Sequence, residues 1–349
     1  MIRAKESVEA LEAYSAPLEG RRGMLRLDFN ENTLGPSPKV LEAIRSMPAE
    51  EYAIYPEYDE IHGVAAAFFG VSREELGLFN GADAAIRAIF DAFAEPGEVF
   101  LTTSPTFGYY QPCAAQQGME IRGVPYPESL EFPLDAFRAE LARSPRIAFI
   151  CNPNNPTGTM LARETILELA RDFPETLLVV DELYATFTGV SVLPESLALP
   201  NLLVLRSLSK SSGLAALRLG FAIGAPGLVD RVSRVTGPYD INSLAVRAGV
   251  AAMSGEDEHT ARYIDEVARA KEYTTQALDE RGVRYFSDGG NFILVFVGEA
   301  LGGVVGGLRG EGILVRSMGG KPVIDGSFRL TIGTLEQMAR FFEAFDRVR

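Results

Sequence analysis

The sequence predicts an α/β fold with a large domain, built on a mostly parallel mixed sheet between helices, and a smaller α+β domain. Between residues 80 and 225, short apolar runs alternate with amphipathic stretches long enough for helices. This alternation is typical of a buried parallel sheet with crossover helices. After about residue 226, helical stretches come first and a few strands follow, which favours a separate α+β unit.

The elements of the large domain follow from these apolar runs. Strands are expected at residues 98–103, 120–124, 146–151, 176–180, 202–206 and 219–224. Helices are expected between them at residues 82–94, 107–117, 135–143 and 163–172. Because the strands are short and apolar, we expect the sheet to be covered on both faces.

The small domain is expected to begin with helices at residues 228–235, 244–253 and 258–280. Strands at 291–297, 313–316 and 328–332 and a final helix from residue 335 follow. Gly237-Pro238-Tyr239 marks the expected boundary. We therefore divide the chain into an N-terminal arm (1–40) that packs with the small domain or a partner subunit, a large domain (41–236) and a small C-terminal domain (237–349).

Composition excludes several classes of function. The 33 Lys and Arg residues against 47 Asp and Glu give a net charge of −14, which argues against a nucleic-acid binder. Two Cys and two His are too few for a disulfide framework, and they make a metal site or a His-based triad an unfavoured hypothesis. No apolar run approaches the ~20 residues of a membrane span, and the N-terminus has no signal-peptide core. We expect a cytoplasmic protein that binds neither membrane nor nucleic acid.

Neither a P-loop nor a G-x-G-x-x-G dinucleotide motif occurs, so the chemistry must lie elsewhere. Ligands of such sheets bind outside the carboxyl ends of the strands. Polar clusters occupy these places at Asn80-Gly81-Ala82-Asp83, Asn152-Pro153-Asn154-Asn155-Pro156-Thr157-Gly158, Asp181-Glu182-Leu183-Tyr184 and Ser207-Leu208-Ser209-Lys210-Ser211-Ser212-Gly213. Each alone has an ordinary explanation as a turn, a helix cap or a solvated loop.

Together the four clusters specify one chemistry. A Lys can form a Schiff base with an aldehyde cofactor. A buried carboxylate can hold a pyridinium nitrogen, and Tyr and Asn can hydrogen-bond a phenolate oxygen. A helix N-terminus, Ser hydroxyls and an Arg can bind a phosphate. These are the parts that pyridoxal 5'-phosphate needs, because the cofactor supplies the electron sink and the protein the electrostatics.

The order of the clusters resembles fold-type I pyridoxal-phosphate-dependent aminotransferases, and most closely the histidinol-phosphate aminotransferase family. The resemblance runs nearly end to end. It rests on Leu27-Asp28-Phe29-Asn30-Glu31-Asn32, Gly35-Pro36-Ser37-Pro38, Tyr55-Pro56-Glu57, Asn154-Asn155-Pro156-Thr157-Gly158, Ser207-Leu208-Ser209-Lys210 and Arg329-Leu330-Thr331-Ile332-Gly333-Thr334. This set is highly specific for the superfamily and less specific for the substrate.

The resemblance implies a role for each matching residue. Lys210 would form the Schiff base and move protons, and Asp181 would pair with the pyridinium nitrogen. Tyr184 and Asn155 would contact the phenolate oxygen, and Phe107 would stack on the ring. The cofactor phosphate would be held by Ala82, Asp83, Ser207, Ser209 and Arg218, and by Tyr55 of a partner subunit. Substrate anions would be bound by Arg316, Arg329, Asn291 and Tyr14.

The implied activity is ping-pong transamination between histidinol phosphate and 2-oxoglutarate in histidine biosynthesis, by a homodimer with shared active sites. Three local departures from the family pattern touch the choice of substrate. Ser317 follows Arg316 where Asp is common, residues 13–17 match a Tyr-x-Pro-Gly turn only loosely, and Lys321 could add a cation near the anion site. An aminotransferase for aromatic or other amino acids, a threonine-phosphate decarboxylase-like lyase and a cofactor-binding regulator remain alternatives.

Overall fold

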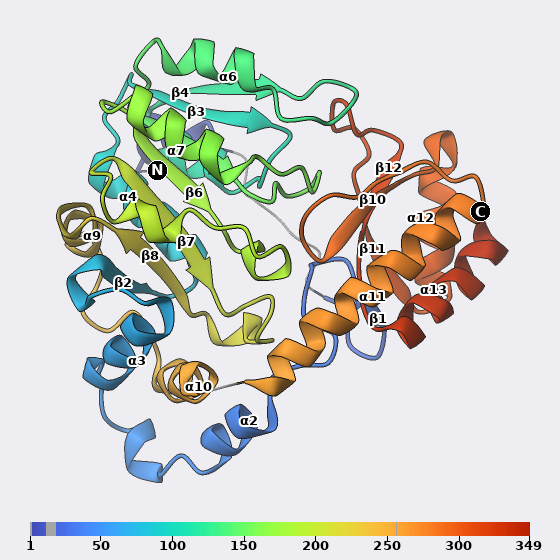
Figure 1. Ribbon diagram of the computed structural model, residues 1–349, viewed down its shortest axis with the longest axis horizontal. Helices are drawn as coiled ribbons and strands as arrows, with labels where there is room; N and C mark the ends of the chain where they lie inside the picture. Colours follow the sequence, from blue (N-terminus) through green and yellow to red (C-terminus); the bar gives the residue numbers. More distant parts are fainter. Residues whose placement is uncertain (1, 12–18, 256) are drawn as a thin grey trace.

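A seven-stranded sheet forms the centre of the larger part of the molecule (Figure 1). The computed structural model describes residues 2–11, 19–255 and 257–349. The strand order is β2-β8-β7-β6-β5-β3-β4, and the strands are β2 (Leu76–Phe79), β3 (Val99–Ser104), β4 (Glu120–Pro125), β5 (Ile147–Cys151), β6 (Leu177–Asp181), β7 (Leu202–Ser207) and β8 (Gly220–Gly224). Strands β3 to β7 pair in parallel, and β8 runs antiparallel to both β7 and β2. The predicted mixed, mostly parallel sheet is confirmed, with β2 as an additional strand.

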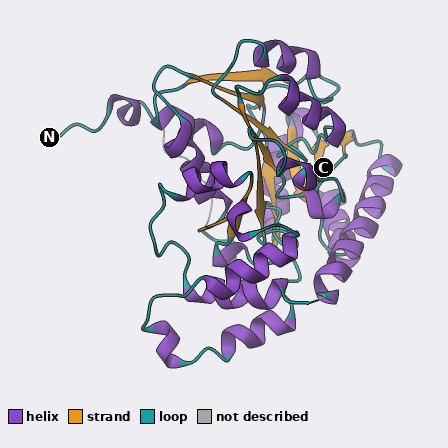
Figure 2. Ribbon diagram, turned by 60° about the vertical axis from the view of Figure 1, so that its left-hand side comes forward, coloured by secondary structure: helices purple, strands orange, loops and turns teal. Residues whose placement is uncertain are grey.

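Helices cover both faces of this sheet, as Figure 2 shows. The core on one face includes α2 (Pro38–Arg45), α3 (Asp59–Phe69), α6 (Leu134–Leu141), α7 (Arg163–Asp172), α8 (Leu193–Ser196) and α10 (Ser243–Met253). The core on the other face includes α4 (Ala82–Phe93), α5 (Tyr110–Gln116) and α9 (Pro226–Ser233). The short α1 (Glu6–Glu9) packs near α5. Successive strand residues therefore face opposite cores.

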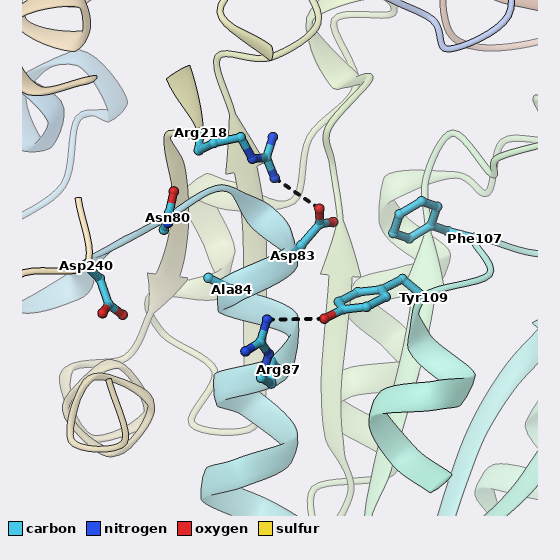
Figure 3. Close-up of a pocket in the computed structure, with 8 residues that line it drawn as sticks. All are labelled: Asn80, Asp83, Ala84, Arg87, Phe107, Tyr109, Arg218 and Asp240. Atoms are coloured by element: carbon cyan, nitrogen blue, oxygen red, sulfur yellow. Dashed lines mark hydrogen bonds and ion pairs between the residues drawn. The ribbon is translucent and has the colours of Figure 1, made fainter. Parts of the chain in front are cut away.

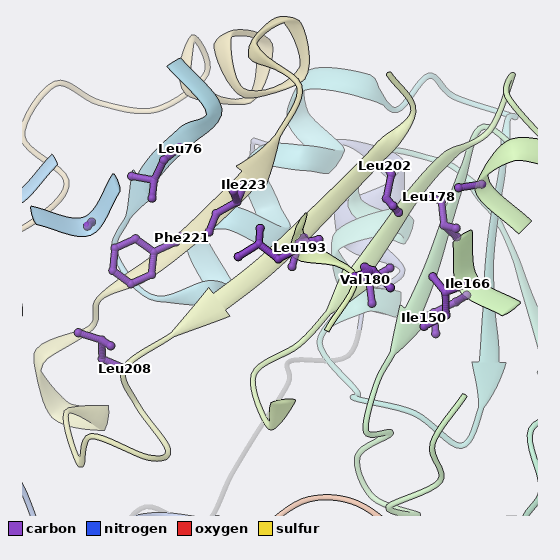
Figure 4. Packing of buried hydrophobic residues seen from close by; sticks show 14 of the residues in the cluster. Leu76, Ile150, Ile166, Leu178, Val180, Leu193, Leu202, Leu208, Phe221 and Ile223 are labelled. Atoms are coloured by element: carbon purple, nitrogen blue, oxygen red, sulfur yellow. The ribbon is translucent and has the colours of Figure 1, made fainter. Parts of the chain in front are cut away.

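The alternation is clear in β5 and β6, which are buried along their whole length. Ile150 and Val180 point into the core drawn in Figure 4, whereas Phe149 and Val179 belong to the opposite core. Side chains alternate because successive residues of a strand face opposite sides of the sheet. Burial on both faces explains why these strands are continuous apolar runs in the sequence.

A second, five-stranded sheet lies in the smaller part, in the order β1-β11-β12-β10-β9 (Figure 1). Its strands are β1 (Leu25–Leu27), β9 (Tyr285–Phe286), β10 (Phe292–Phe296), β11 (Ile313–Ser317) and β12 (Ser327–Thr331). The helices α11 (Glu258–Glu280), α12 (Leu301–Gly310) and α13 (Leu335–Val348) pack on it. Within the described ranges, no helix has both the length and the apolar composition to cross a membrane.

The packing of α10 moves the domain boundary that the sequence suggested. This helix packs against α2 and α3, and its residues Ala245, Ala248 and Met253 belong to the core of the large sheet. We therefore propose that the large domain extends through α10 and that the boundary lies between α10 and α11 rather than at residue 237. In the N-terminal arm, β1 pairs in parallel with β11, so this strand lies on the small sheet.

Candidate active site

Most of the predicted site residues line one cavity of about 400 Å³. Strands β5, β6 and β7 end at the same edge of the sheet because they are parallel. Strand β2 runs in the same direction, since both β2 and β7 are antiparallel to β8, so α4 also begins at this edge. The predicted residues at the cavity are Ala82, Asp83, Phe107, Asn155, Asp181, Tyr184, Ser207, Ser209, Lys210, Arg218, Arg316 and Arg329.

Lys210 lies just beyond β7, with its side chain at the cavity. Its Nζ donates to the carbonyl oxygen of Phe29 at 2.9 Å. Burial lowers the pKa of this amine to about 8, and the positive charge of Arg329 adds to the effect. Glu31 and Asp83 oppose it only in part. A lysine whose amine loses its proton this readily is suited to nucleophilic attack and to proton transfer.

Asp181 is the last residue of β6 and is buried. Burial raises the pKa of its carboxyl group to about 6, although two hydrogen bonds favour the ionised form. The backbone N–H of Leu183 donates to Oδ1 at 3.2 Å, and the Tyr110 hydroxyl donates to Oδ2 at 2.5 Å. The cavity therefore has a carboxylate fixed by two donors in its wall.

The hydroxyl group of Tyr184 is the centre of a second set of hydrogen bonds. It accepts from Nδ2 of Asn30 at 3.0 Å and from Nδ2 of Asn155 at 3.3 Å. Burial raises the pKa of Tyr184, which keeps the hydroxyl protonated and available as a donor. Tyr184 and Asn155 thus come together as the sequence predicted.

A group of donors surrounds the start of α4. Gly81 has a φ of 78°, and α4 begins at the next residue, so its first backbone N–H groups face this end of the cavity. The Arg218 guanidinium lies 3.0 Å from the Asp83 carboxylate. Arg218 itself has a φ of 59°, which is uncommon for a residue with a side chain. Ser207 Oγ lies 2.9 Å from Ser209 Oγ, close to the same end.

These residues fit the pyridoxal phosphate that the family resemblance implies. A buried amine, a buried carboxylate and a phenol–amide pair lie around one cavity, with N–H, hydroxyl and guanidinium donors at one end. The backbone is also shaped for this: a Cβ on Gly220 would lie 2.4 Å from the backbone of Gly81 and Ala82. Only glycine allows β8 to approach the start of α4 so closely.

Two arginines face each other across the small sheet. Arg316 and Arg329 are directly opposite in the antiparallel pair of β11 and β12, and both line the cavity. Arg329 is buried and donates to Asn155 Oδ1 and to the Asp28 carbonyl oxygen. Like charges directly opposite each other on a sheet are destabilising, so an anion between them would relieve a real repulsion.

A second cavity of about 440 Å³ adjoins the first and shares Asp83, Phe107 and Arg218 with it. Figure 3 shows its walls, with Arg218 bonded to Asp83 and Arg87 to the Tyr109 hydroxyl. Phe107 thus lines both cavities.

Among the described residues, two of the predicted ones, Asn291 and Tyr55, do not line the main cavity. Asn291, which the sequence predicts to bind substrate, is fully buried and donates to the Asn30 carbonyl oxygen at 3.2 Å. Tyr55 is exposed and stacks on Tyr239 with ring centroids 4.0 Å apart. Tyr14 lies outside the described residues.

Two residues that support the site through hydrogen bonds, Asn30 and Tyr110, were not singled out by the sequence. Asn30 holds Tyr184, and its own backbone N–H and side chain bond to Thr331 Oγ1 at 2.9 and 3.0 Å. In the sequence, Asn30 is part of the motif Leu27 to Asn32, but nothing there indicates its role. Tyr110 holds Asp181 and gave no signal, because a Tyr on an apolar helix face is usually core.

This geometry agrees with comparisons to known proteins. Residues 22–345 match the family described as aminotransferase class I and II. The chain belongs to the class I and II aminotransferase family. It is 35% identical to histidinol-phosphate aminotransferase 2 of Pseudomonas fluorescens, over 93% of this chain and 89% of that protein. It is 30% identical to the histidinol-phosphate aminotransferase of Moorella thermoacetica, over 99% of this chain and 93% of that one.

Solved structures share the fold. The histidinol-phosphate aminotransferase of Sinorhizobium meliloti, crystallised in complex with pyridoxal-5'-phosphate, superimposes with a TM-score of 0.91 at 22% identity, covering 100% of this chain and 98% of that chain. A putative histidinol-phosphate aminotransferase from Erwinia carotovora atroseptica gives a TM-score of 0.87 at 25% identity, covering 96% of this chain and 98% of the other. The predicted fold-type I architecture is confirmed.

Proposed function

We propose that this aminotransferase binds pyridoxal 5'-phosphate in the main cavity and transfers an amino group from histidinol phosphate to 2-oxoglutarate in histidine biosynthesis. The observation that carries the proposal is the position of Lys210. Its buried amine, with a pKa lowered to about 8, lies at a cavity that also holds Asp181, Tyr184 and two cross-strand arginines. The names of the relatives support this choice of substrate.

The chain's own residues divide the work. When bound, the cofactor supplies an electron sink for the negative charge that develops on the substrate carbon. Asp181 would hold a proton on the ring nitrogen by its negative charge, and Tyr184 and Asn155 would donate to the phenolate oxygen. Lys210 Nζ would attach the cofactor and, as a free amine, would move a proton from the substrate carbon to the cofactor. The start of α4, Ser207, Ser209 and Arg218 would hold the phosphate.

The substrate end of the cavity suits an anion. Arg316 and Arg329 present guanidinium groups, which match phosphate and carboxylate oxygens in pairs. The same fork serves the histidinol phosphate in one half-reaction and the dicarboxylate in the other. Phe29 and Met318 line the cavity as well and offer apolar contact to a flat ring.

A panel of amines tests the substrate. Purified protein loaded with pyridoxal phosphate is incubated with 2-oxoglutarate and either histidinol phosphate, Phe, Tyr or His, and glutamate formation is measured. We expect the highest kcat/KM for histidinol phosphate. Preference for Phe or Tyr would support the aromatic aminotransferase instead. Carbon dioxide release without any 2-oxo acid would support the lyase.

We further propose that the enzyme is a cytoplasmic homodimer whose Tyr55 reaches the cofactor phosphate of the partner subunit. Tyr55 is 69% exposed and does not line the main cavity of its own chain, which supports a role across an interface. Cys113 and Cys151 are both buried thiols, in keeping with a reducing compartment. Sedimentation and cell fractionation test the two statements.

A further inference from the structure

Tyr110 connects two parts of the site although it does not line the cavity. It is the first residue of α5 and is fully buried. Its hydroxyl donates to Oδ2 of Asp181 at 2.5 Å. Its ring meets Phe107 edge to face at 5.4 Å between centroids and Phe149 at 4.8 Å. One buried side chain thus contacts both the acid and the aromatic residue of the site.

The hydrogen bond matters because Asp181 is buried, with 3% of its surface exposed. Burial raises the pKa of this carboxyl group most, and the negative charges of Asp83 and Glu182 raise it further, whereas few donors oppose them. The backbone N–H of Leu183 reaches Oδ1 at a longer 3.2 Å, so the Tyr110 hydroxyl is the closer of the two donors. Burial also raises the pKa of Tyr110, so its hydroxyl keeps its proton and always acts as the donor.

The contacts with neighbouring rings fix the direction of this hydroxyl. Tyr110 is held edge to face by both Phe107 and Phe149, and Phe149 belongs to the interior strand β5. A ring packed on two sides cannot rotate away without opening the core. The donor is therefore preorganised, and the carboxylate it holds has one orientation.

We propose that Tyr110 is a positioning residue that keeps the Asp181 carboxylate ionised and aimed into the cavity, and that it couples this acid to the packing of Phe107. This inference rests on the proposed function, in which Asp181 faces the ring nitrogen of the cofactor. A hydrogen bond to a charged group in a buried site is stronger than one between neutral groups. Its loss should show first as a change in the acidity of Asp181.

The test measures pyridoxal phosphate binding to the apoprotein as a function of pH, by fluorescence or dialysis. Protonation of Lys210 below about pH 8 should weaken binding in the wild type and in the variants alike. Protonation of Asp181 should add a second decline, the acid limb, with a wild-type midpoint near the pKa of about 6. In Tyr110→Phe, we expect that midpoint to move upward by about one to two pH units, the size set by one charge-assisted hydrogen bond. A purely structural role would lower the melting temperature without moving the midpoint.

Tyr285→Phe is the matched control. Its hydroxyl donates to the carboxylate of Asp279 at 3.1 Å, far from the residues that line the cavity. We expect no change in the binding midpoint. If Tyr110→Phe does not fold, Tyr110→Gln and Tyr110→Met make the same comparison, because they are similar in size and only Gln supplies a donor. Gln should keep the midpoint closer to wild type than Met.

Asp181→Asn distinguishes a failure of the proposed function from a failure of the role proposed for Tyr110. This variant should lose the acid limb of binding altogether. If the wild-type protein does not bind pyridoxal phosphate, the proposed function fails. If the wild type binds with an acid limb that Asp181→Asn removes, but Tyr110→Phe keeps the wild-type midpoint, the role of Tyr110 alone is refuted.

Discussion

At the scale of single residues, the chemistry of this site depends on what surrounds each group rather than on which groups are present. Lys210 and Asp181 are common residues, but burial moves the pKa of each toward neutrality. The pKa of Lys210 falls to about 8, and that of Asp181 rises to about 6. Such perturbed groups in a cavity are typical of catalytic sites. These pKa shifts also predict how the free energy of unfolding depends on pH, which can be measured without any substrate.

The pKa of Lys210 predicts a pH-dependent stability of the apoprotein. Between pH 8 and 10.5, the folded protein has released the Lys210 proton, whereas the unfolded chain still binds it. The unfolded state then binds more protons, so the free energy of unfolding rises with pH. Relative to Lys210→Met, the wild type should gain at most about 3 kcal/mol across this window. Urea unfolding of both proteins at several pH values checks this, and a difference that is constant with pH would contradict it.

We predict that Lys321 contributes to selectivity for a highly charged substrate. It lines the same cavity as Arg316 and Arg329 and adds a third positive charge at that end. In Lys321→Gln, we expect the KM for histidinol phosphate to rise about three- to tenfold, with little change for Phe, because the lost attraction grows with substrate charge. Lys39→Gln, which removes the same charge from a side chain outside the cavity, is the control. An equal KM change for both substrates would contradict the prediction.

At the scale of elements, the site depends on the close approach of backbone segments and on strand register. The start of α4 and the strand β8 touch at Gly81 and Gly220, and the register of β11 and β12 sets Arg316 against Arg329. These are contacts between segments far apart in the chain. Substitutions there should act on cofactor or anion binding through the backbone.

Gly220→Ala tests the contact between β8 and α4. The added Cβ would lie 2.4 Å from backbone atoms of Gly81 and Ala82, so the start of α4 has to move. We expect weaker binding of pyridoxal phosphate, by about tenfold or more, and a loss of stability of about 1–3 kcal/mol typical of overpacking. Equilibrium dialysis and urea unfolding measure the two effects. Cofactor affinity unchanged from wild type would show that this contact does not shape the phosphate end.

In the glycine-rich helix α12, we expect Gly→Ala substitutions at two neighbouring positions to have opposite effects on stability. Gly306 is exposed, and a Cβ there would contact nothing within 4 Å, so Gly306→Ala should raise the free energy of unfolding by about 0.5–1 kcal/mol. A Cβ on Gly307 would lie 2.8 Å from the Val348 side chain, so Gly307→Ala should stabilise less or destabilise. Thermal or urea unfolding ranks the two variants. The reverse order would contradict the packing of α12 on α13.

At the scale of the whole molecule, global charge and local charge have opposite signs. The chain carries a net charge of −14, yet Lys210, Arg218, Arg316, Lys321 and Arg329 all line one cavity. Several apolar side chains are also exposed, among them Tyr52, Ile54, Tyr55 and Tyr239. Exposed apolar groups of this kind often mark an interface between subunits.

Mixing two inactive variants tests whether Tyr55 acts across the proposed dimer. Lys210→Ala and Tyr55→Ala should each have low activity alone. After the two are unfolded and refolded together, half of the dimers carry one intact site, so activity should recover to about a quarter of wild type. No recovery, although sedimentation shows dimers, would mean that Tyr55 acts within its own chain.

The local sequence was sufficient for the fold class and most of the site. Buried parallel strands are continuous apolar runs, and their carboxyl ends must share one edge, so the clusters at Asp181 and Lys210 could be placed together before any coordinates. The short strands β1 and β2 were missed because they have three and four residues and little periodicity. The packing of α10 on α2 and α3 could not be predicted from local sequence, because these helices lie about two hundred residues earlier in the chain.

The sequence by itself determined the family and predicted the reactive lysine and the residue types around the cofactor, because these depend on motifs and on the period of the strands. Only the tertiary structure decided which side chains hold the predicted site residues in place. Three hydrogen bonds join residues 71 to 261 positions apart in the chain. They run from Tyr110 to Asp181, from Asn30 to Tyr184 and from Asn291 to Asn30. Such contacts depend on how elements pack and in which register, and no local pattern encodes that.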